Sequence, residues 1–290
     1  MRYPDNYALL PQEACGYEDS PTVVLPVPFE RTVSYGKGTA GGPEAIILAS
    51  QYMELWDEEL GNEPFRPGIA TLPSFEPKSS EIAAALDEIE AEARRHLEAG
   101  KFLITLGGEH SLTLAPVRAS RAVFGEIGVV QFDAHADLRA DYQGTPFSHA
   151  CVMRRIVEEG IPTAAVGLRS LSTPEAQFAA ERRLPVLWAY QMEREPGRFA
   201  GLLEELPEKV YLTFDIDYFD PSLVPATGTP EPGGGFWYPT LELLKVLFAR
   251  KQVVAMDVVE LAPQEGSPAS DFVAAKLIYK CLGYRREYQR

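Results

Sequence analysis

Short apolar runs rich in β-branched residues alternate with longer amphipathic or alanine-rich stretches along this chain. That alternation is typical of βαβ units, which build a parallel sheet covered by helices on both faces. We therefore predict an α/β fold with about eight parallel strands. The expected strands are residues 22–27, 68–72, 102–106, 127–132, 163–168, 185–189, 210–214 and 253–259. The expected helices are residues 43–55, 80–99, 112–124, 149–159, 174–184, 195–206, 240–250 and 270–284.

The size of the chain allows one large α/β domain or two smaller ones, because 290 residues with 46% hydrophobic content can bury a large core. The sequence contains no internal repeat, low-complexity tract or convincing linker. The Pro/Gly-rich segments 61–68 and 225–239 are therefore interpreted as long loops of a single domain, 1–290, in which residues 1–20 form an N-terminal extension. Long loops of this kind often carry function.

The net charge of −15 argues against nucleic acid as a partner, because no basic surface is available to neutralise phosphates. It suits a cationic small substrate, although acidity that only keeps a protein soluble explains it equally well. The three cysteines (Cys15, Cys151 and Cys281) form no CxxC pair, so neither a disulfide framework nor a cysteine zinc site is expected. Without an apolar signal core, or an apolar run near about 20 residues, we expect a cytoplasmic protein with no membrane partner.

Charged and imidazole side chains directly follow several of the expected strands. Ligands of an open parallel sheet bind just beyond the carboxyl ends of its strands, so these side chains are expected to gather at one edge. They are His110 after 102–106; Asp133, His135 and Asp137 after 127–132; Arg169 and Ser170 after 163–168; Asp215 and Asp217 after 210–214; and Glu260 after 253–259.

The segment DAHAD, residues 133–137, has the least ordinary pattern. Alternation with alanine sends its three polar side chains to one side of an extended segment. Carboxylates crowded together repel each other, and a bound cation removes that repulsion. Taken alone, the pair Asp215 and Asp217 fits an ordinary acidic turn, and GGEHS fits a turn in which Ser111 caps a helix. Together, at the ends of separate strands, the three segments predict a metal site.

The four histidines are distributed unevenly. His110, His135 and His149 lie in or next to the segments just described. His96 lies in the charged helical stretch EARRHLEAG, where we expect it on a solvated face.

The candidate ligands indicate which metal is bound. They are four carboxylates and two imidazoles: His110, Asp133, His135, Asp137, Asp215 and Asp217. Oxygen-rich ligation without cysteine favours a hard ion such as Mn²⁺ over structural zinc. Four carboxylates around a single divalent ion would leave unbalanced negative charge, so we predict two divalent ions per chain. Two ions held close together activate a shared water, which indicates a binuclear hydrolase.

The segments GGEHS, DAHADLR, SHA, DIDYFDPSLVPATGTPEPGGG and DVVELAP resemble, in this order and across essentially the whole chain, the ureohydrolase family of arginases and agmatinases. The resemblance implies an arginase/deacetylase-like, three-layer α/β/α sandwich. It also implies two Mn²⁺ ions that cleave a small guanidino compound to urea and an amine. Members of this family usually form trimers or hexamers, so a homo-oligomer is expected.

The resemblance assigns roles to individual residues. Asp133 and Asp215 would bridge the two ions, His110 and Asp137 would complete one ligand set, and His135 and Asp217 would complete the other. His149 matches the family's proton-shuttling histidine, and Glu260 matches the acid that receives the guanidinium group. Asp137 would pass a proton to the departing amine. A helix-start residue with a satisfied side chain is the alternative for His149, and Arg169 is expected to organise the loop after its strand.

The substrate is the least constrained part of the prediction. The loop DLRADYQGTPFSHA is similar to that of the agmatinase-type subgroup and lacks the Asn/Ser-rich arginase pattern, so agmatine, cleaved to urea and putrescine, is expected. Ala150, where many relatives have glycine, leaves the role of the preceding histidine intact. The main alternative is N1-aminopropylagmatine, cleaved to urea and spermidine, whose longer cationic tail the loop 31–42 is placed to contact. Arginine, guanidinobutyrate and formimidoylglutamate are further alternatives. Candidates to line the path of the tail, each with ordinary packing as its alternative, are Tyr35, Tyr142, Phe147 and Trp237.

Two other classes of function fit the sequence less well. A phosphoesterase would need a basic cluster beside the metal segments to hold its phosphate, and there is none. A non-catalytic metal-binding relative would lack a ligand or Glu260, and all of these residues are present.

Overall fold

An eight-stranded sheet runs through residues 6–195 and 197–289, the part of the chain that the computed structural model describes. Its strand order is β2-β1-β3-β8-β7-β4-β5-β6, and every neighbouring pair is parallel. The predicted α/β fold with eight parallel strands is therefore confirmed. The strands are β1 (Thr22–Val27), β2 (Ile69–Thr71), β3 (Phe102–Gly107), β4 (Gly128–Phe132), β5 (Thr163–Val166), β6 (Val186–Leu187), β7 (Lys209–Asp215) and β8 (Gln252–Val259).

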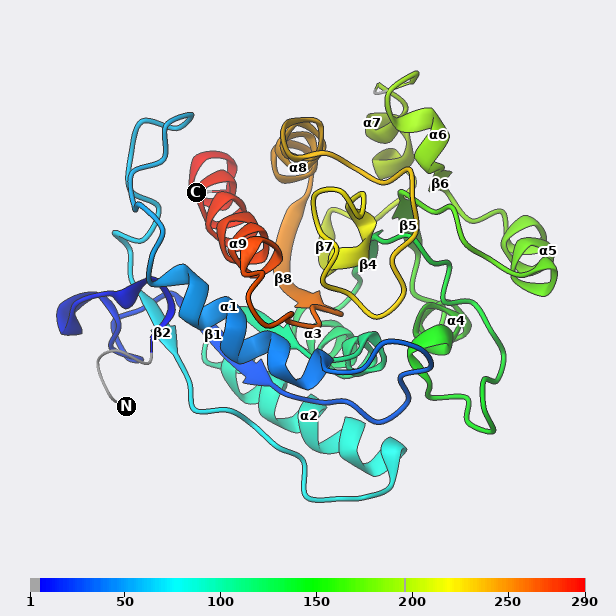
Figure 1. Ribbon diagram of the computed structural model, residues 1–290, viewed down its shortest axis with the longest axis horizontal. Helices are drawn as coiled ribbons and strands as arrows, with labels where there is room; N and C mark the ends of the chain where they lie inside the picture. The colour runs from blue at the N-terminus through cyan, green and yellow to red at the C-terminus, as the bar shows by residue number, and fades with distance from the viewer. Residues whose placement is uncertain (1–5, 196, 290) are drawn as a thin grey trace.

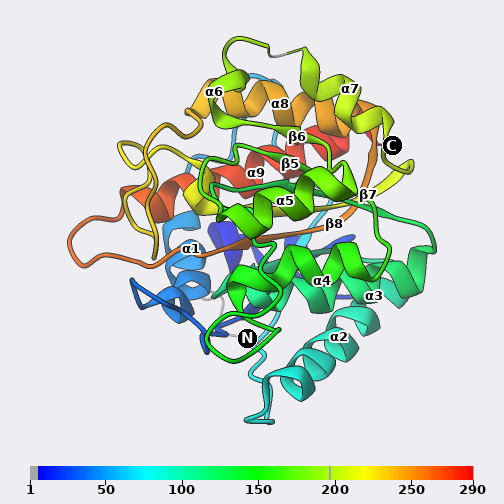
Figure 2. The same cartoon turned by 90° about the vertical axis from the view of Figure 1, so that its right-hand side faces the viewer.

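Helices cover both faces of the sheet, which makes the predicted three layers (Figure 1). One layer contains α1 (Gly42–Ser50), α7 (Arg198–Glu204), α8 (Trp237–Arg250) and α9 (Ala269–Tyr288). The opposite layer contains α2 (Ile82–Glu98), α3 (Leu114–Phe124), α4 (Val152–Glu158) and α5 (Thr173–Arg182). Figure 2, a view from the side, separates α8 and α9 above the sheet from α2, α3 and α4 below it. Within the described ranges, no helix combines the length and the apolar character that crossing a lipid bilayer requires.

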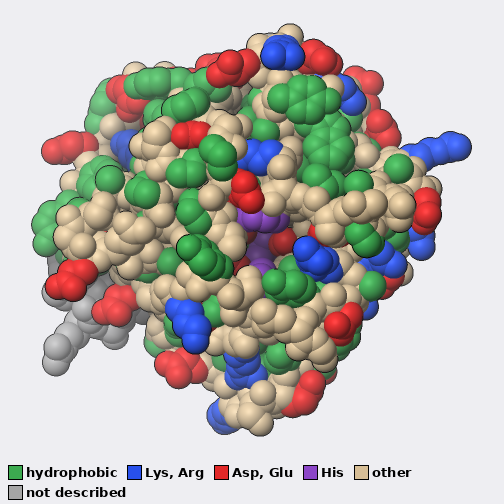
Figure 3. Space-filling model, turned by 45° about the vertical axis from the view of Figure 1, so that its right-hand side comes forward, with side chains coloured by type: hydrophobic (Ala, Val, Ile, Leu, Met, Phe, Trp, Pro, Cys, Tyr) green, Lys and Arg blue, Asp and Glu red, His purple; other side chains and the backbone are tan. Residues whose placement is uncertain are grey.

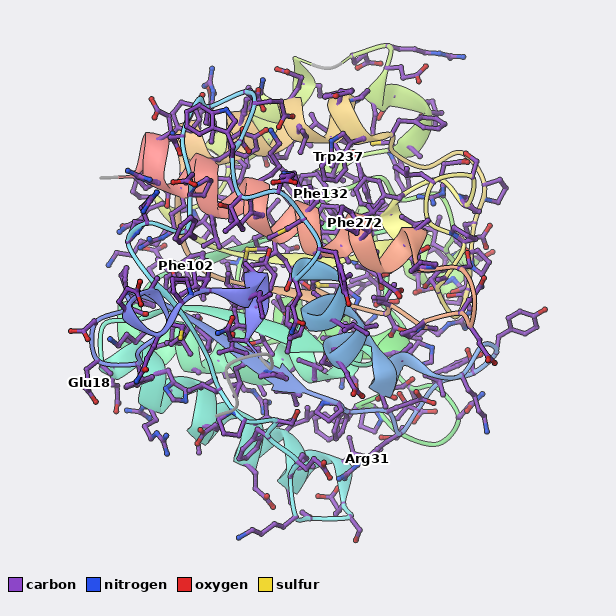
Figure 4. The ribbon with its side chains drawn as sticks, turned by 60° about the vertical axis from the view of Figure 1, so that its left-hand side comes forward. Glu18, Arg31, Phe102, Phe132, Trp237 and Phe272 are labelled. Atoms are coloured by element: carbon purple, nitrogen blue, oxygen red, sulfur yellow. The ribbon has the colours of Figure 1, made fainter. Side chains whose placement is uncertain are left out.

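Successive residues of the strands point to opposite faces and fill two separate cores. Val24 and Leu212 pack into the core beneath α1, α8 and α9. Val23 and Tyr211, one position earlier in the same strands, pack into the core beneath α2, α3 and α4. Because both faces are buried, the strands are continuous apolar runs, which is the pattern that predicted them. Phe132, labelled with Trp237 in Figure 4, belongs to the first of these cores.

Short elements lie between the strands and the main helices. They are α6 (Ala189–Met192) and the 3₁₀ helices η2 (Tyr7–Leu9), η3 (Gln12–Ala14), η4 (Thr39–Gly41), η5 (His110–Thr113), η6 (His149–Cys151) and η7 (Ile216–Tyr218). The sequence pattern did not predict them as separate elements, because three or four residues show no period; η6 and part of η5 lie within the expected helices 149–159 and 112–124. Three of them, η5, η6 and η7, contain candidate site residues.

The expected helix 43–55 is wrong in its second half, because α1 ends at Ser50. The next residues turn across α9 instead. The Tyr279 hydroxyl donates to the carbonyl of Leu55 at 2.6 Å, and the buried Lys280 ammonium lies 3.0 Å from Asp57. These long-range contacts outweigh the local helical periodicity.

Other boundaries differ by a few residues. The expected strand 185–189 is reduced to β6, since Ala189 already begins α6. The expected helix 240–250 begins earlier, at Trp237. The expected helix 195–206 is observed as Arg198–Glu204, and its residue 196 lies outside the described residues, as do residues 1–5 of the expected N-terminal extension.

His96 is a clear correction, because it is fully buried rather than solvated. The segment before β1 lies over α2, and the Tyr17 hydroxyl is 2.9 Å from Nδ1 of His96. Glu92, one turn earlier in the helix, lies 3.1 Å from Nε2. Lys101 fastens the covering segment by donating to the carbonyls of Tyr17, Glu18 and Ser20. A helical wheel shows charged neighbours but does not show which segment later covers them.

Candidate metal centre

The candidate site residues gather at the carboxyl edge of the sheet. They follow β3, β8, β7, β4 and β5, which are consecutive in the sheet. Because all these strands are parallel, the residues beyond their last positions meet in one place, as the sequence predicted. Figure 3 shows histidine side chains at the base of a hollow on this side of the molecule, with acidic side chains beside them.

Five of the six predicted ligands form two groups that share Asp133, and the sixth, Asp215, lies beside His110. Nδ1 of His110 lies 3.1 Å from Asp133 and 3.0 Å from Asp137. Asp215 approaches the same nitrogen at 3.4 Å. Two clusters with the spacing of metal ligands result: His110, Asp133 and Asp137 form one, and Asp133, His135 and Asp217 form the other.

The environment of His110 fits a metal ion better than a hydrogen bond. Its Nδ1 is buried and, among the described residues, has no hydrogen-bond partner of acceptable geometry, although carboxylate oxygens surround it. Its Nε2 is 2.9 Å from the Thr213 hydroxyl, which in turn donates to Asp257 at 2.7 Å. The hydroxyl therefore accepts from Nε2–H, and the lone pair of Nδ1 points into the cluster. Ligand histidines are commonly held in this way by their second nitrogen.

The pKa values of the crowded carboxylates reflect negative charge that a bound cation would balance. Burial, together with the nearby Asp137 and Asp217 carboxylates, raises the pKa of Asp133 to about 7. Burial likewise raises the pKa of Asp215 well above its usual range. At the other cluster, burial opposes the charged forms, but the contact between the two residues dominates: the pKa of His135 rises to about 11 and that of Asp217 falls to about 2. Divalent cations among these oxygens would favour every ionised carboxylate.

Two residues of the site have left-handed backbone conformations. Asp137 has φ 52° and Glu260 has φ 63°. Such angles are uncommon outside glycine and cost free energy that the surroundings must supply. Glu260 is held there because its amide donates to the carbonyl of Gly108 at 2.8 Å and its Oε1 accepts from the amide of His110 at 2.6 Å. The conformation turns the end of β8 towards the ligands that follow β3.

His149 lies at the wall of the hollow, at the start of η6. Its amide donates to the Thr32 hydroxyl at 3.0 Å, and its Nδ1 lies 3.2 Å from the same oxygen. Its Nε2 is 3.4 Å from the Ser34 hydroxyl. The buried Glu109 holds Thr32 in place by accepting from its hydroxyl at 2.8 Å. The loop 31–34 thus supports a histidine far along the chain.

Arg169 organises the loops beside the site, as expected. Its guanidinium donates to five main-chain carbonyls: those of Gly167, Asp217, Tyr218, Phe219 and Glu231. The loop packs so closely that a Cβ atom on Gly235 would lie 2.4 Å from the Tyr218 ring. Glycine there and the arginine together hold the 215–219 segment and the 229–235 segment side by side.

These residues enclose a cavity of about 370 Å³, within the usual size range of small-molecule sites. Of the aromatic residues expected along the substrate's path, only Tyr142 lines it. Tyr35 is 83% exposed and lies off the cavity lining. Phe147 and Trp237 pack against the two cores, so ordinary packing is the correct interpretation for both.

Comparisons with known proteins agree with this geometry. The model of the Arginase family matches residues 20–283. The chain belongs to the arginase family. Its resemblance to the ureohydrolases is thereby confirmed, and with it the expected class of enzyme.

Individual members of the arginase family match along almost their whole length. An N(1)-aminopropylagmatine ureohydrolase of Synechocystis sp. is 42% identical over 94% of this chain and 92% of that protein. One of Thermus thermophilus is 40% identical over 93% of this chain and 92% of that protein. The crystal structure of the agmatine ureohydrolase of Thermoplasma volcanium, 30% identical, superposes with a TM-score of 0.86 over 96% of this chain and 94% of that one.

The sequence analysis missed several residues that the arginase-family cavity contains. They are Ser34, Arg139, Ser172, Glu175, Thr229 and Glu231. Ser34 and Thr229 lie in loops that the pattern marked as long or variable, but nothing in their spacing distinguished them. Glu231 lies inside the quoted segment ATGTPEPGGG, so its place in a segment already singled out was the available signal.

Proposed function

We propose that this arginase-family chain hydrolyses the guanidino group of N1-aminopropylagmatine to urea and spermidine, with two Mn²⁺ ions in the cluster of six ligands. The observation that carries the choice of substrate is the name shared by the two relatives at 42% and 40% identity. The sequence alone ranked agmatine first. Agmatine is now the second candidate, because relatives named as agmatinases are less similar; one of Pyrococcus horikoshii is 36% identical. A homo-oligomer, trimeric or hexameric, built from single-domain chains in the cytoplasm is part of the same proposal.

The ligand set fits the proposed ions, since carboxylates and imidazoles suit Mn²⁺ and the unpartnered Nδ1 of His110 faces three carboxylates. Two bound divalent ions would supply an activated water at neutral pH and stabilise developing negative charge. Positioning of the substrate falls to the protein itself. Oε1 of Glu260 already accepts from the amide of His110, so Oε2 is left to accept from the planar guanidinium group.

The proton transfers are assigned to two residues that line the cavity. Asp137, which has a left-handed backbone conformation, would take a proton from the activated water and give it to the departing amine. His149 exchanges protons between the cavity and solvent, because its ring reaches the Ser34 and Thr32 hydroxyls in the loop above it.

The test is urea release after loading with Mn²⁺, comparing N1-aminopropylagmatine, agmatine, arginine and guanidinobutyrate. We expect the highest kcat/KM for N1-aminopropylagmatine, and no urea from Asp133→Ala, which loses the carboxylate shared by both clusters. A preference for agmatine would move the chain to the second candidate. No urea from any of the four compounds, with two Mn²⁺ bound per chain, would refute the assignment to guanidino hydrolysis.

A further inference from the structure

The acidic side chains that line the cavity differ in how many of their carboxylate oxygens already have a partner. Asp137 and Asp217 belong to the ligand clusters, and Asp215 lies 3.4 Å from Nδ1 of His110. Glu260 accepts from the amide of His110. Glu175 has both oxygens occupied, since Oε1 accepts from the amide of Leu138 and Oε2 accepts from the amide and hydroxyl of Ser172. The remaining acidic side chain of the cavity lining is Glu231.

The backbone and one carboxylate oxygen of Glu231 are held by hydrogen bonds, whereas its second carboxylate oxygen has no partner among the described residues. Its carbonyl accepts from Arg169 at 2.8 Å and 3.2 Å, and its Oε1 accepts from the Ser170 hydroxyl at 2.9 Å. Oε2 has neither a hydrogen bond nor an ion pair with any residue that the structure describes. A half-buried carboxylate with a fixed backbone and one open oxygen is well suited to bind a cation.

The tether of Glu231 also places it beside the metal cluster. Ser170 pairs with His135 in a parallel bridge, its amide donates to Ala134 at 3.0 Å, and its carbonyl accepts from Ala136 at 3.2 Å. The residue that holds the carboxylate is therefore part of the same ladder as the ligand segment 133–137. Glu231 lines the same cavity as the metal cluster, on the side of the 229–235 loop. A substrate whose guanidino group lies at the metal cluster would therefore have Glu231 within the same cavity.

The positive charges near the cavity do not neutralise Glu231. Arg139 lines the same cavity, but its guanidinium lies 3.9 Å from Glu175 and 5.0 Å from the centre of the Tyr142 ring. Arg169 directs its donors to carbonyl oxygens. Arg139 thus lies beside Glu175, and the carboxylate of Glu231 forms no ion pair with either arginine.

We propose that Glu231 binds the distal amine of the substrate and so selects guanidino compounds with a cationic tail against those with a carboxylate tail. The inference rests on the proposed function, because it assigns the second recognition group of the same cavity. Glu260 would hold the guanidinium end, and Glu231 would hold the ammonium end. Compounds with a carboxylate at that end would be repelled.

The experiment compares wild type, Glu231→Gln and the charge-matched control Glu265→Gln, whose side chain is exposed and lies outside the cavity lining. Each protein is loaded with Mn²⁺, and kcat and KM are measured for N1-aminopropylagmatine, agmatine and n-butylguanidine, which has no distal amine. In Glu231→Gln we expect kcat/KM to fall about 10- to 100-fold for the two cationic-tail substrates, mainly through KM. We expect n-butylguanidine to be unaffected, and Glu265→Gln to behave as wild type. Where n-butylguanidine is not hydrolysed, its Ki as a competitive inhibitor replaces kcat/KM.

The outcomes separate the two proposals. Equal losses for all three compounds in Glu231→Gln, or no loss for the cationic-tail substrates, would overturn the role of Glu231 while leaving the ureohydrolase assignment intact. Failure of the wild type to release urea from any guanidino compound would overturn the proposed function instead. Competitive inhibition by spermidine gives a second readout, because this product keeps the amines and lacks the guanidino group. Its Ki should rise in Glu231→Gln and stay unchanged in Glu265→Gln.

Discussion

At the scale of the residue, the orientation of His110 depends on groups that do not touch the cluster themselves. The Thr213 hydroxyl accepts from Nε2 and donates to Asp257, which is fully buried. Asp257 also accepts from the hydroxyls of Thr113 and Tyr211, both at 2.8 Å. This carboxylate therefore orders three hydroxyl groups, and one of them fixes the tautomer of a predicted metal ligand.

Thr213→Val keeps the shape of the side chain and removes the hydroxyl that fixes His110. We expect Mn²⁺ affinity and kcat to fall about 10- to 100-fold, since the ligand loses its orienting partner. Calorimetric titration of the stripped protein with Mn²⁺ measures the affinity. Thr213→Ser restores the hydroxyl and should recover most of both values. Unchanged Mn²⁺ affinity in the valine variant would show that Thr213 does not orient the histidine.

At the scale of the element, the ends of β1 and β3 approach each other closely where the ligand segments begin. Gly108 follows β3, and a Cβ atom there would lie 2.1 Å from the carbonyl oxygen of Phe29, just beyond β1. The amide of Gly108 donates to Val27, and its carbonyl accepts from Glu260. The glycine thus lets three segments approach closely at the position where the ligands begin.

Gly108→Ala should destabilise the protein by about 1–3 kcal/mol or more, because the new methyl group meets backbone rather than a movable side chain. Gly201→Ala is the matched control. Gly201 lies in α7, is exposed and has no atom within 4 Å of the added Cβ, so this change should stabilise by about 0.4–1 kcal/mol. Urea unfolding of the two variants gives both free energies. Equal stability of the two variants would contradict the close approach of Phe29.

The elements also show what could be predicted from the sequence and what could not. Runs of apolar residues buried on both faces gave the strands. Polar residues directly after those runs gave the candidate ligands, and the structure brings five of them into two clusters, because a parallel sheet brings the ends of its strands together. The end of α1 and the burial of His96 were wrong, since each depends on a segment far away in the sequence that covers it. Thr213 and Glu231 were missed for a related reason. Their roles come from which partner they face, and no spacing encodes that.

At the scale of the whole molecule, binding of ions at this cluster should be measurable as stability. A ligand that binds only the folded state adds about 2.7 kcal/mol at 100 times its Kd, which for a chain of this size corresponds to a rise in Tm of roughly 5 °C. Removal of metal with EDTA should therefore lower Tm by about that amount, and added Mn²⁺ should restore it. The same cycle applied to Asp133→Ala should leave Tm nearly constant, and an equal shift in that variant would place the stabilising ion elsewhere.

The rise in Tm that Mn²⁺ causes should also depend on pH. The pKa of Asp133 without metal is raised to about 7, so below that pH the folded protein holds a proton there that the ion must displace. The rise in Tm with Mn²⁺ should accordingly be smaller at pH 6 than at pH 8.

The predicted metal ligands and the other residues that line the cavity belong to different parts of the fold. The predicted metal ligands follow the rigid strands β3, β4 and β7, whereas Ser34, Tyr142 and Glu231 stand on separate connecting segments. A duplicated gene can therefore acquire substitutions in these connections without disturbing the chemistry beneath them. Divergence of substrate preference would proceed by the exchange of loop residues over an inherited reaction centre. Laboratory evolution restricted to these three segments would change the substrate-lining residues and leave the predicted metal ligands untouched.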